Sequence, residues 1–157
     1  MFSKKERSTF PYWFAHWCAF NMTALNLRVW KFKYLFHDIE KPWLMLLWRD
    51  YKRVQKYHRT HNRHHLEYNG KRGYDYMAMI IDWECSRFTK KDAPMDAWQT
   101  LKTMMDESKD KKYRQKLYIN LAYTLLDLKL TSIFGVNILH DNMLYDYIEN
   151  PQLEYDV

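Results

Sequence analysis

Residues 110–130 read DKKYRQKLYINLAYTLLDLKL, and this stretch decides the fold class. Within it, Tyr113, Leu117, Leu121 and Leu125 are spaced four apart. Residues at this spacing lie on one face of an α-helix, so the stretch predicts a helix whose apolar stripe packs into a core. Core packing accounts for the stripe better than a cofactor site does.

The composition of the whole chain also favours helices. Among 157 residues there are only three glycines and four prolines, and 47% are hydrophobic, which suits one all-α domain over 1–157 with a sizeable core. The seven Trp, thirteen Tyr and eight Phe fall mostly at helical spacing and indicate core packing rather than base stacking. Asp96 is expected to cap a helix. We predict helices over 9–27, 29–38, 42–57, 74–88, 94–107 and 110–130, with a short one near 140–148.

Charge is unevenly distributed along the chain. The net charge is +6, and the chain opens with a basic segment, 1–9. The acidic segment 140–157 holds five acids and no lysine or arginine, so the first 139 residues carry +11. A strongly basic body suits an anionic partner such as a nucleotide, a cyclic nucleotide or a nucleic acid. The acidic segment is typical of a solvated terminus, with a regulatory role as the alternative.

Neither a membrane span nor a secreted disulfide framework is expected. Charges interrupt every apolar stretch well before the roughly 18 residues that a span needs. The apolar part after segment 1–9 lacks a small-residue cleavage site, so we reject a signal peptide. Cys18 and Cys85 are the only cysteines and have no paired spacing, which excludes a zinc ribbon. We therefore expect a reduced, cytoplasmic protein.

Four residues are candidate metal ligands because their polar side chains stand in apolar surroundings or at a helix end, where they would need a partner. Asp82 ends an apolar helical stretch, where an unpaired carboxylate is expensive to desolvate. His16 lies in the apolar run 12–20, and His37 and Asp38 stand where a helix would end before Pro42. Taken singly, His16 would more often be a hydrogen-bonded core histidine and Asp82 an acid paired with an arginine.

The segment 57–68 is the densest functional candidate. It holds four histidines within eight residues, among them His58, His64 and His65. A solvated basic loop and a nucleic-acid contact surface are the alternatives. Histidine adds little charge at neutral pH, however, and is the usual residue for metal ligation and proton transfer. We interpret the segment as part of a metal site.

A divalent transition metal, as one or two ions, would satisfy these groups together. Imidazole and carboxylate suit manganese, iron, cobalt, nickel or zinc better than calcium, and magnesium is a further candidate. A second His-Asp pair, His140 and Asp141, lies in the acidic segment without a later aspartate in an apolar helix. We interpret this second pair as a surface feature.

The run from His16 to about Leu130 resembles a family of small bacterial and phage proteins of unassigned function, similar in pattern to the HD-domain metal-dependent phosphohydrolase superfamily. The matching motifs are His37-Asp38-x-x-Lys41, Asn62-x-His64-His65-x-Glu67-Tyr68 and Met79-Ile80-Ile81-Asp82-Trp83. The resemblance implies a helical bundle of the HD-domain type in the cytoplasm of a bacterial cell or phage-infected host.

The resemblance also implies a ligand set. The principal metal would be bound by His16, His37, Asp38 and Asp82, with Asp38 bridging to a second ion where there is one. His58, His64 and His65 would hold that second ion or contact the phosphate. Asp38, Lys41 and His64 are expected to take part in catalysis, with Lys41 meeting substrate charge or polarising the attacking water. Two such ions clamp a phosphoryl group and stabilise its leaving oxygen.

Basic residues near this set are expected to bind substrate. They are Lys41, Arg59, Arg63, Lys71 and Arg72, whose side chains suit phosphate oxygens. Gly73-Tyr74-Asp75 is similar to the Gly-Tyr-Pro turn of HD-type phosphodiesterases that cleave cyclic dinucleotides, but the proline is missing. Cyclic dinucleotides are therefore one candidate substrate class.

Two functions follow as hypotheses. The first is a metal-dependent phosphohydrolase, either a phosphomonoesterase or a phosphodiesterase, acting on a nucleotide, a cyclic nucleotide or a related phosphate ester. The second is a catalytically inactive HD-like module that binds nucleic acid or protein, such as a phage-encoded modifier of the host. The buried setting expected for Asp82 and His16 favours the enzyme. A homo-oligomer would suit the aromatic-rich helical surface.

Overall fold

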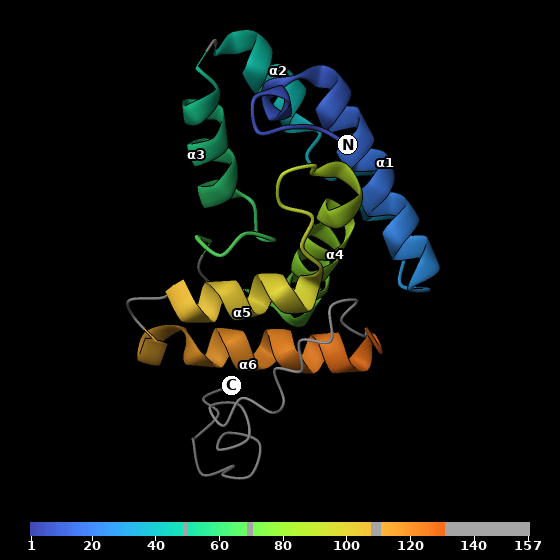
Figure 1. Cartoon of the computed structure of the whole chain (residues 1–157), viewed down its shortest axis with the longest axis vertical. Coiled ribbons are helices and arrows are strands. Elements are labelled where there is room, and N and C mark those ends of the chain that lie inside the picture. The colour runs from blue at the N-terminus through green and yellow to red at the C-terminus, as the bar shows by residue number, and fades with distance from the viewer. Residues whose placement is uncertain (49, 69–70, 108–110, 131–157) are drawn as a thin grey trace. The chain divides into compact units, whose positions relative to one another are not determined.

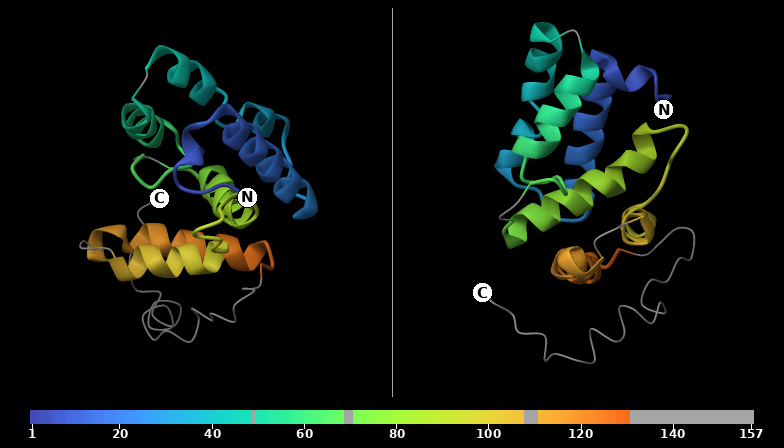
Figure 2. Two further views of the ribbon diagram at one scale, coloured as in Figure 1. Left: turned by 45° about the horizontal axis from the view of Figure 1, so that its top comes forward. Right: turned by 90° about the vertical axis from the view of Figure 1, so that its left-hand side faces the viewer.

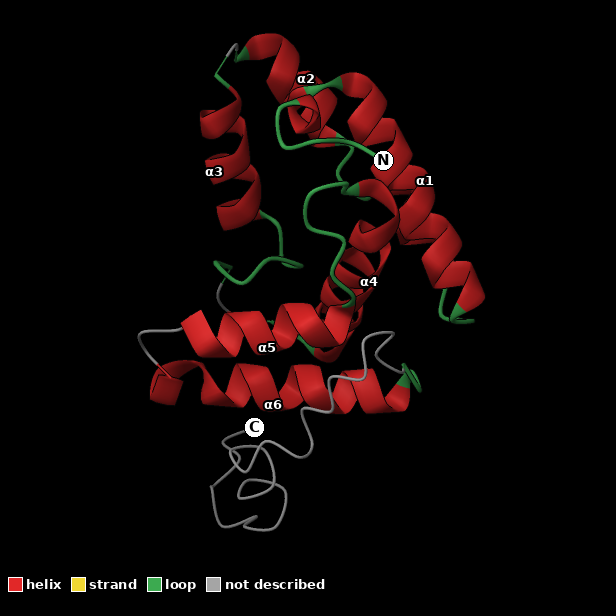
Figure 3. Cartoon of the chain, in the orientation of Figure 1, coloured by secondary structure: helices red, strands yellow, loops and turns green. Residues whose placement is uncertain are grey.

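The computed structural model describes residues 1–48, 50–68, 71–107 and 111–130 (Figure 1). This part of the chain is all-α, as predicted, and Figure 3 shows helices joined by loops without a strand in it. Its elements are η1 (Glu6–Ser8), α1 (Phe10–Asn26), η2 (Phe32–Phe36), α2 (Glu40–Leu47), α3 (Tyr51–His61), α4 (Gly73–Thr89), α5 (Ala97–Glu107) and α6 (Lys111–Asp127).

The chain divides into two compact units, residues 1–96 and 97–157. Every residue predicted to bind metal or substrate belongs to the first unit. None of the described helices combines the length and the apolarity that a membrane crossing requires. The second His-Asp pair, the helix predicted near 140–148 and the acidic segment 140–157 lie outside the described residues.

Helix α1 begins and ends close to its predicted limits of 9–27. The Thr9 side chain accepts a hydrogen bond from the backbone N–H of Tyr12 at 3.4 Å, and Pro11 stands in the first turn, where its missing N–H costs nothing. The run 12–20 is less buried than its apolar sequence suggested, because Phe14 remains 52% exposed.

Helices α1 and α4 pack against each other and form the main core of the first unit (Figure 1). The core is a cluster of fully or almost fully buried side chains: Phe20, Ala24, Tyr34, Ile81 and Cys85. Because Ile81 directly precedes Asp82 on α4, this packing fixes the position of one predicted metal ligand.

The predicted helix over 42–57 is wrong, because the chain forms two helices there. Trp48 has extended backbone angles, φ −115° and ψ 110°, and ends α2. Asp50 then caps α3 by accepting a hydrogen bond from the backbone N–H of Lys52 at 2.9 Å. The helix predicted over 29–38 is reduced to the 3-10 turn η2, which leaves His37 and Asp38 in a short connection before α2.

Helices α4, α5 and α6 agree more closely with prediction. α4 begins with a capping box, in which the Asp75 side chain accepts from the backbone N–H of Arg72 at 2.8 Å. α5 and α6 lie side by side in the second unit (Figure 2). Leu121 and Leu125 of the predicted stripe are fully buried, and Asp96 stands immediately before α5.

Candidate metal centre

The chain brings all seven predicted metal ligands into two neighbouring groups. His16 lies on α1, His58 on α3 and Asp82 on α4, whereas the others lie on connections: His37 and Asp38 between η2 and α2, and His64 and His65 after α3. Asp38 has a left-handed backbone, with φ 58°, a conformation that aspartate adopts more readily than most residues. The break between η2 and α2 therefore directs Asp38 toward the other ligands.

The first group joins α1, α4 and the connection before α2. His16 Nε2 lies 2.8 Å from Asp82 Oδ1 and 4.0 Å from Asp38 Oδ2. His37 Nε2 lies 3.5 Å from Asp82 Oδ1 and 3.6 Å from Asp38 Oδ1. One nitrogen or oxygen from each of His16, His37 and Asp38 can be chosen so that all three lie within 4.8 Å of one another.

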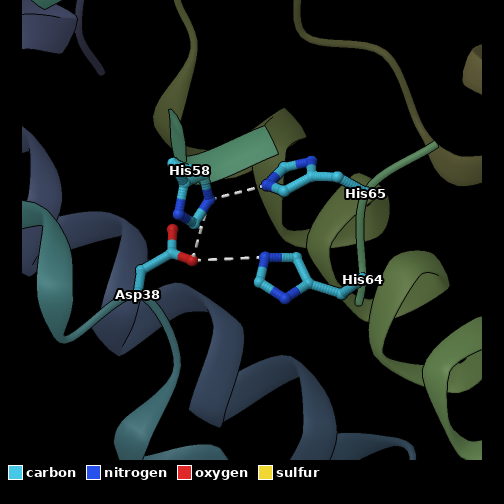
Figure 4. A group of neighbouring side chains, drawn as sticks. All are labelled: Asp38, His58, His64 and His65. Atoms are coloured by element: carbon cyan, nitrogen blue, oxygen red, sulfur yellow. Dashed lines mark hydrogen bonds and ion pairs between the residues drawn. The ribbon is translucent and has the colours of Figure 1, made fainter. Parts of the chain in front are cut away.

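The second group surrounds the same Asp38 carboxylate. Figure 4 shows His58 and His64 directed toward this carboxylate and His65 directed toward His58. Asp38 Oδ1 is 3.2 Å from His58 Nε2 and 3.2 Å from His64 Nε2, and His65 Nε2 is 2.6 Å from His58 Nε2. Asp38 therefore belongs to both groups.

Donor spacing and missing hydrogen bonds both fit a bound metal. Bonds of 2.0–2.2 Å to one ion place neighbouring donor atoms roughly 3 to 3.5 Å apart. Three of the seven distances match this spacing: those from Asp38 Oδ1 to His58 Nε2 and His64 Nε2, and that from Asp82 Oδ1 to His37 Nε2. His37 Nε2, His64 Nε2 and Asp38 Oδ1 are buried and find no hydrogen-bond partner within the described part of the chain. Buried polar atoms normally have partners, and a cation would serve all three.

The tautomer of His58 also favours a bound cation. Its Nδ1 contacts Glu40 Oε1, and a carboxylate oxygen can only accept, so Nδ1 carries the hydrogen. The lone pair then stands on Nε2, where His65 Nε2 lies 2.6 Å away and can donate to it, but Asp38 Oδ1, another acceptor, lies 3.2 Å from the same atom. A cation between them would turn this repulsion into two bonds.

Three residues that were not predicted as ligands support them: Glu40, Trp13 and Asn62, the last of which belongs to the Asn62-x-His64-His65 motif. Glu40 accepts from His58 and from Asn62 Nδ2, the latter at 2.7 Å. Trp13 Nε1 donates to the backbone carbonyl of Asp38 at 2.8 Å. Glu40 follows Asp38 by two positions and Asn62 precedes His64 by two, so their places within the motifs were the only sequence signal for them.

The electrostatics of the site keep its carboxylates charged and favour the neutral form of His37, His58 and His65. Burial acts to raise the pKa of Asp38, but His37, Lys41 and His58 outweigh it and hold this pKa well below its usual range. Burial also acts to raise the pKa of Asp82, but the hydrogen bond with His16 and the nearby His37 outweigh it and hold this pKa well below its usual range. Burial lowers the pKa of His37 to about 4. Deprotonated ligands of this kind are the form that binds metal.

His16 is more deeply buried than Asp82, its hydrogen-bond partner. His16 is 6% exposed, which confirms the burial expected of it, whereas the Asp82 side chain keeps 15% exposure. Cys85 is buried beside them, and its Sγ lies 3.8 Å from His16 Nδ1. Burial raises the pKa of the Cys85 thiol well above its usual range, so it stays protonated at neutral pH.

A narrow pocket opens beside the first group. Lys41, which was predicted to meet substrate charge or to polarise the attacking water, pairs with Asp38 there. The pocket walls include His16 and Asp38 together with Lys41 and Arg7, and two tyrosines, Tyr12 and Tyr51, complete the polar lining. Arg7 comes from the basic segment 1–9 and was not predicted to take part.

The other predicted substrate-binding residues do not line this pocket. The side chain of Arg59 pairs with Glu67 at 2.7 Å, and that of Arg63 with Asp75 at 3.0 Å. Lys71 donates to the backbone carbonyl of Tyr68, and Arg72 forms the N-cap of α4.

The segment Gly73-Tyr74-Asp75 is the first turn of α4. Asp75 there serves the helix cap and the Arg63 ion pair, which is a structural role.

Comparison of the chain with models of protein families, with curated proteins and with solved structures found no match in any of the three. The function is therefore argued from the site itself.

Proposed function

We propose that this protein is a metal-dependent phosphohydrolase of the HD type, acting on a nucleotide or a related phosphate ester. One observation carries the proposal. His37 Nε2, His64 Nε2 and Asp38 Oδ1 are buried side by side without hydrogen-bond partners among the described residues. A purely structural core would fill such positions with apolar side chains or satisfy them, since unpaired buried polar atoms are destabilising.

The ligands divide into a principal and a second set. His16, His37, Asp38 and Asp82 would hold the principal ion, and Asp38 with His58, His64 and His65 a second one. Manganese, iron, cobalt, nickel or zinc suits this mixture of imidazole and carboxylate. Such an ion supplies Lewis-acid stabilisation of charge on phosphoryl oxygens and lowers the pKa of bound water.

The protein's own residues would position the substrate and manage protons. Lys41 carries a positive charge against Asp38, and Asp38 and Asp82 raise the pKa of Lys41 against the effect of burial, so the ammonium remains charged beside the pocket. His64 differs from the other site histidines, because Asp38 raises its pKa despite burial. With only the principal ion bound, a histidine with this preference would hold a proton and pass it to a leaving oxygen; with the second ion bound, His64 would be a ligand of that ion instead.

The test is metal analysis of protein purified without a histidine tag. We would compare the wild type with Asp38→Asn and Asp82→Asn, and with Asp127→Asn as a matched control, since Asp127 is an exposed residue at the end of α6. One to two equivalents of a transition metal are expected in the wild type and the control. Both ligand variants should lose the metal while keeping helical circular dichroism.

Activity is measured on the same samples, with p-nitrophenyl phosphate, bis(p-nitrophenyl) phosphate and nucleotides as substrates. Hydrolysis that requires the metal and both aspartates would support the proposal. A wild-type protein that takes up none of the five metals when they are added would overturn it. Salt-dependent binding of nucleic acid would then become the property to measure.

A further inference from the structure

The N-terminal segment, residues 1–9, is part of the first unit and is hydrogen-bonded to the end of α4, the helix that carries Asp82. The backbone N–H of Phe2 donates to Thr89 O at 2.8 Å, and the N–H of Lys91 donates back to Phe2 O at 2.9 Å. The Phe2 ring also meets Tyr12 edge to face, with centroids 5.5 Å apart. This short bridge at the end of α4 makes the segment part of the site wall rather than a solvated tail.

The Arg7 side chain lines the pocket, and its guanidinium forms an ion pair through one nitrogen. Its Nη2 pairs with Asp92 Oδ1. Its Nε is buried and has no hydrogen-bond partner within the part of the chain that the structure describes. A guanidinium has five N–H donors in a rigid fork, which matches the oxygens of a phosphate group. Arg7 therefore lines the pocket with a guanidinium whose donors the described residues do not fully satisfy.

The charges around the pocket favour a doubly negative group. One divalent cation would balance Asp38 and Asp82, and Asp92 balances Arg7. Lys41 and Lys90 then remain as two uncompensated positive charges. Lys90 lies within electrostatic range of Asp82, Arg7 and Lys41, and burial together with the two cations lowers its pKa despite Asp82. A second anionic charge at the site would relieve this repulsion.

The tyrosines of the pocket add neutral donors. Burial and the nearby Asp82 raise the pKa of Tyr12, and burial also raises that of Tyr51, so both hydroxyls remain protonated near neutral pH. A protonated hydroxyl can donate to a phosphate oxygen without adding charge. The pocket thus combines two fixed cations, Arg7 and Lys41, with two neutral donors.

We propose that Arg7 and Lys41, with Tyr12 and Tyr51, bind the free oxygens of a terminal phosphate, so that the substrate is a phosphomonoester. This inference rests on the proposed phosphohydrolase function and narrows its substrate class. A monoester is a dianion at neutral pH and has three free oxygens and one ester arm. A phosphodiester carries one charge and has only two free oxygens, so it would leave part of this set of cations and donors unmatched.

The probe is inorganic phosphate, titrated by calorimetry into the manganese-loaded full-length protein. Arg7→Met is compared with Arg53→Met, which removes the same charge from an exposed position on α3 where Arg53 covers the Trp48 ring. Arg7→Lys is the second variant, because it keeps the charge but loses the fork. Metal content and thermal melting are recorded for every sample.

We expect Arg7→Met to weaken phosphate binding at least tenfold with its manganese retained, Arg7→Lys to fall between, and Arg53→Met to equal the wild type. In Arg7→Met, the kcat/KM for p-nitrophenyl phosphate should fall in parallel with phosphate affinity. In the wild type, the kcat/KM for p-nitrophenyl phosphate should exceed that for bis(p-nitrophenyl) phosphate. Equal phosphate affinity in wild type and in folded Arg7→Lys and Arg7→Met would overturn the inference.

Two further outcomes separate the inference from the function beneath it. A wild type that prefers the diester, with metal bound, refutes the monoester assignment and leaves the phosphohydrolase intact. A wild type without metal or hydrolysis refutes both.

Discussion

Replacing Glu40 with glutamine tests whether the second group of ligands is built for metal. Glu40 contacts His58 Nδ1 and accepts from Asn62 Nδ2 at 2.7 Å, so it fixes the tautomer that leaves His58 Nε2 beside Asp38. Carboxylates that orient a metal-bound histidine contribute about 10 to 100-fold in metal affinity. The Glu40→Gln variant should therefore bind manganese or zinc with a Kd roughly 10 to 100 times higher, or about 1.4 to 2.7 kcal/mol.

The measurement is a competition titration of metal-free protein against a chromogenic chelator. The matched control is Glu67→Gln, because Glu67 also pairs with a basic side chain, Arg59, but on an exposed surface. The control should bind metal as the wild type does. If Glu40→Gln matched the wild type within twofold while remaining folded, Glu40 would have no orienting role, and the second group would be no metal site of the kind proposed.

Three other properties can be checked by urea denaturation of metal-free protein. Ile81→Ala should lower the free energy of unfolding by about 2 to 5 kcal/mol, since Ile81 is fully buried in the core, and a loss below about 1 kcal/mol would contradict that packing. Asp50→Ala should cost about 1 kcal/mol through the lost α3 cap, whereas an unchanged midpoint would mean that the break after α2 has another cause. Acid should also destabilise the fold: Asp82 has a folded pKa below its unfolded value, so its stabilisation is present above about pH 4 and is lost as pH falls through the folded pKa. Asp82→Asn should flatten this pH dependence, and a slope equal to that of the wild type would contradict the pKa direction.

The parts of the fold that sequence predicted best are those where apolar spacing alone decides the structure. α1 and α4 have strong local patterns, and their limits fall within one or two residues of the prediction. The break between α2 and α3 was missed because residues 42–57 contain no glycine and no proline after Pro42. Asp50 ends that apparent continuity through a side-chain cap, and capping aspartates are hard to distinguish from surface ones in a charged stretch.

The candidate site, like the fold, was predicted well where the signal lies within a short stretch of sequence and was missed where it depends on tertiary contacts. The fold brings together the seven candidate ligands that the sequence indicated, and five of them lie in short motifs such as His37-Asp38 and His64-His65 that are recognisable as sequence. Arg7 was not selected, since only the folded chain brings a basic N-terminal residue beside Lys41. Arg59 looked equivalent to Arg7 in the sequence, yet its partner is Glu67 on the surface. Charge type is visible in a sequence, but the partner that neutralises it depends on tertiary contacts.

The left-handed backbone of Asp38 has a consequence for how the protein opens. In metal-free protein this residue combines a conformation that costs about 1 kcal/mol or more with a buried carboxylate oxygen that has no hydrogen-bond partner among the described residues. Both costs fall on the short connection between η2 and α2, which is neither helix nor core. Amide hydrogen exchange should therefore be fastest there and should slow when metal binds, so that metal occupancy can be followed by the protection of a single turn.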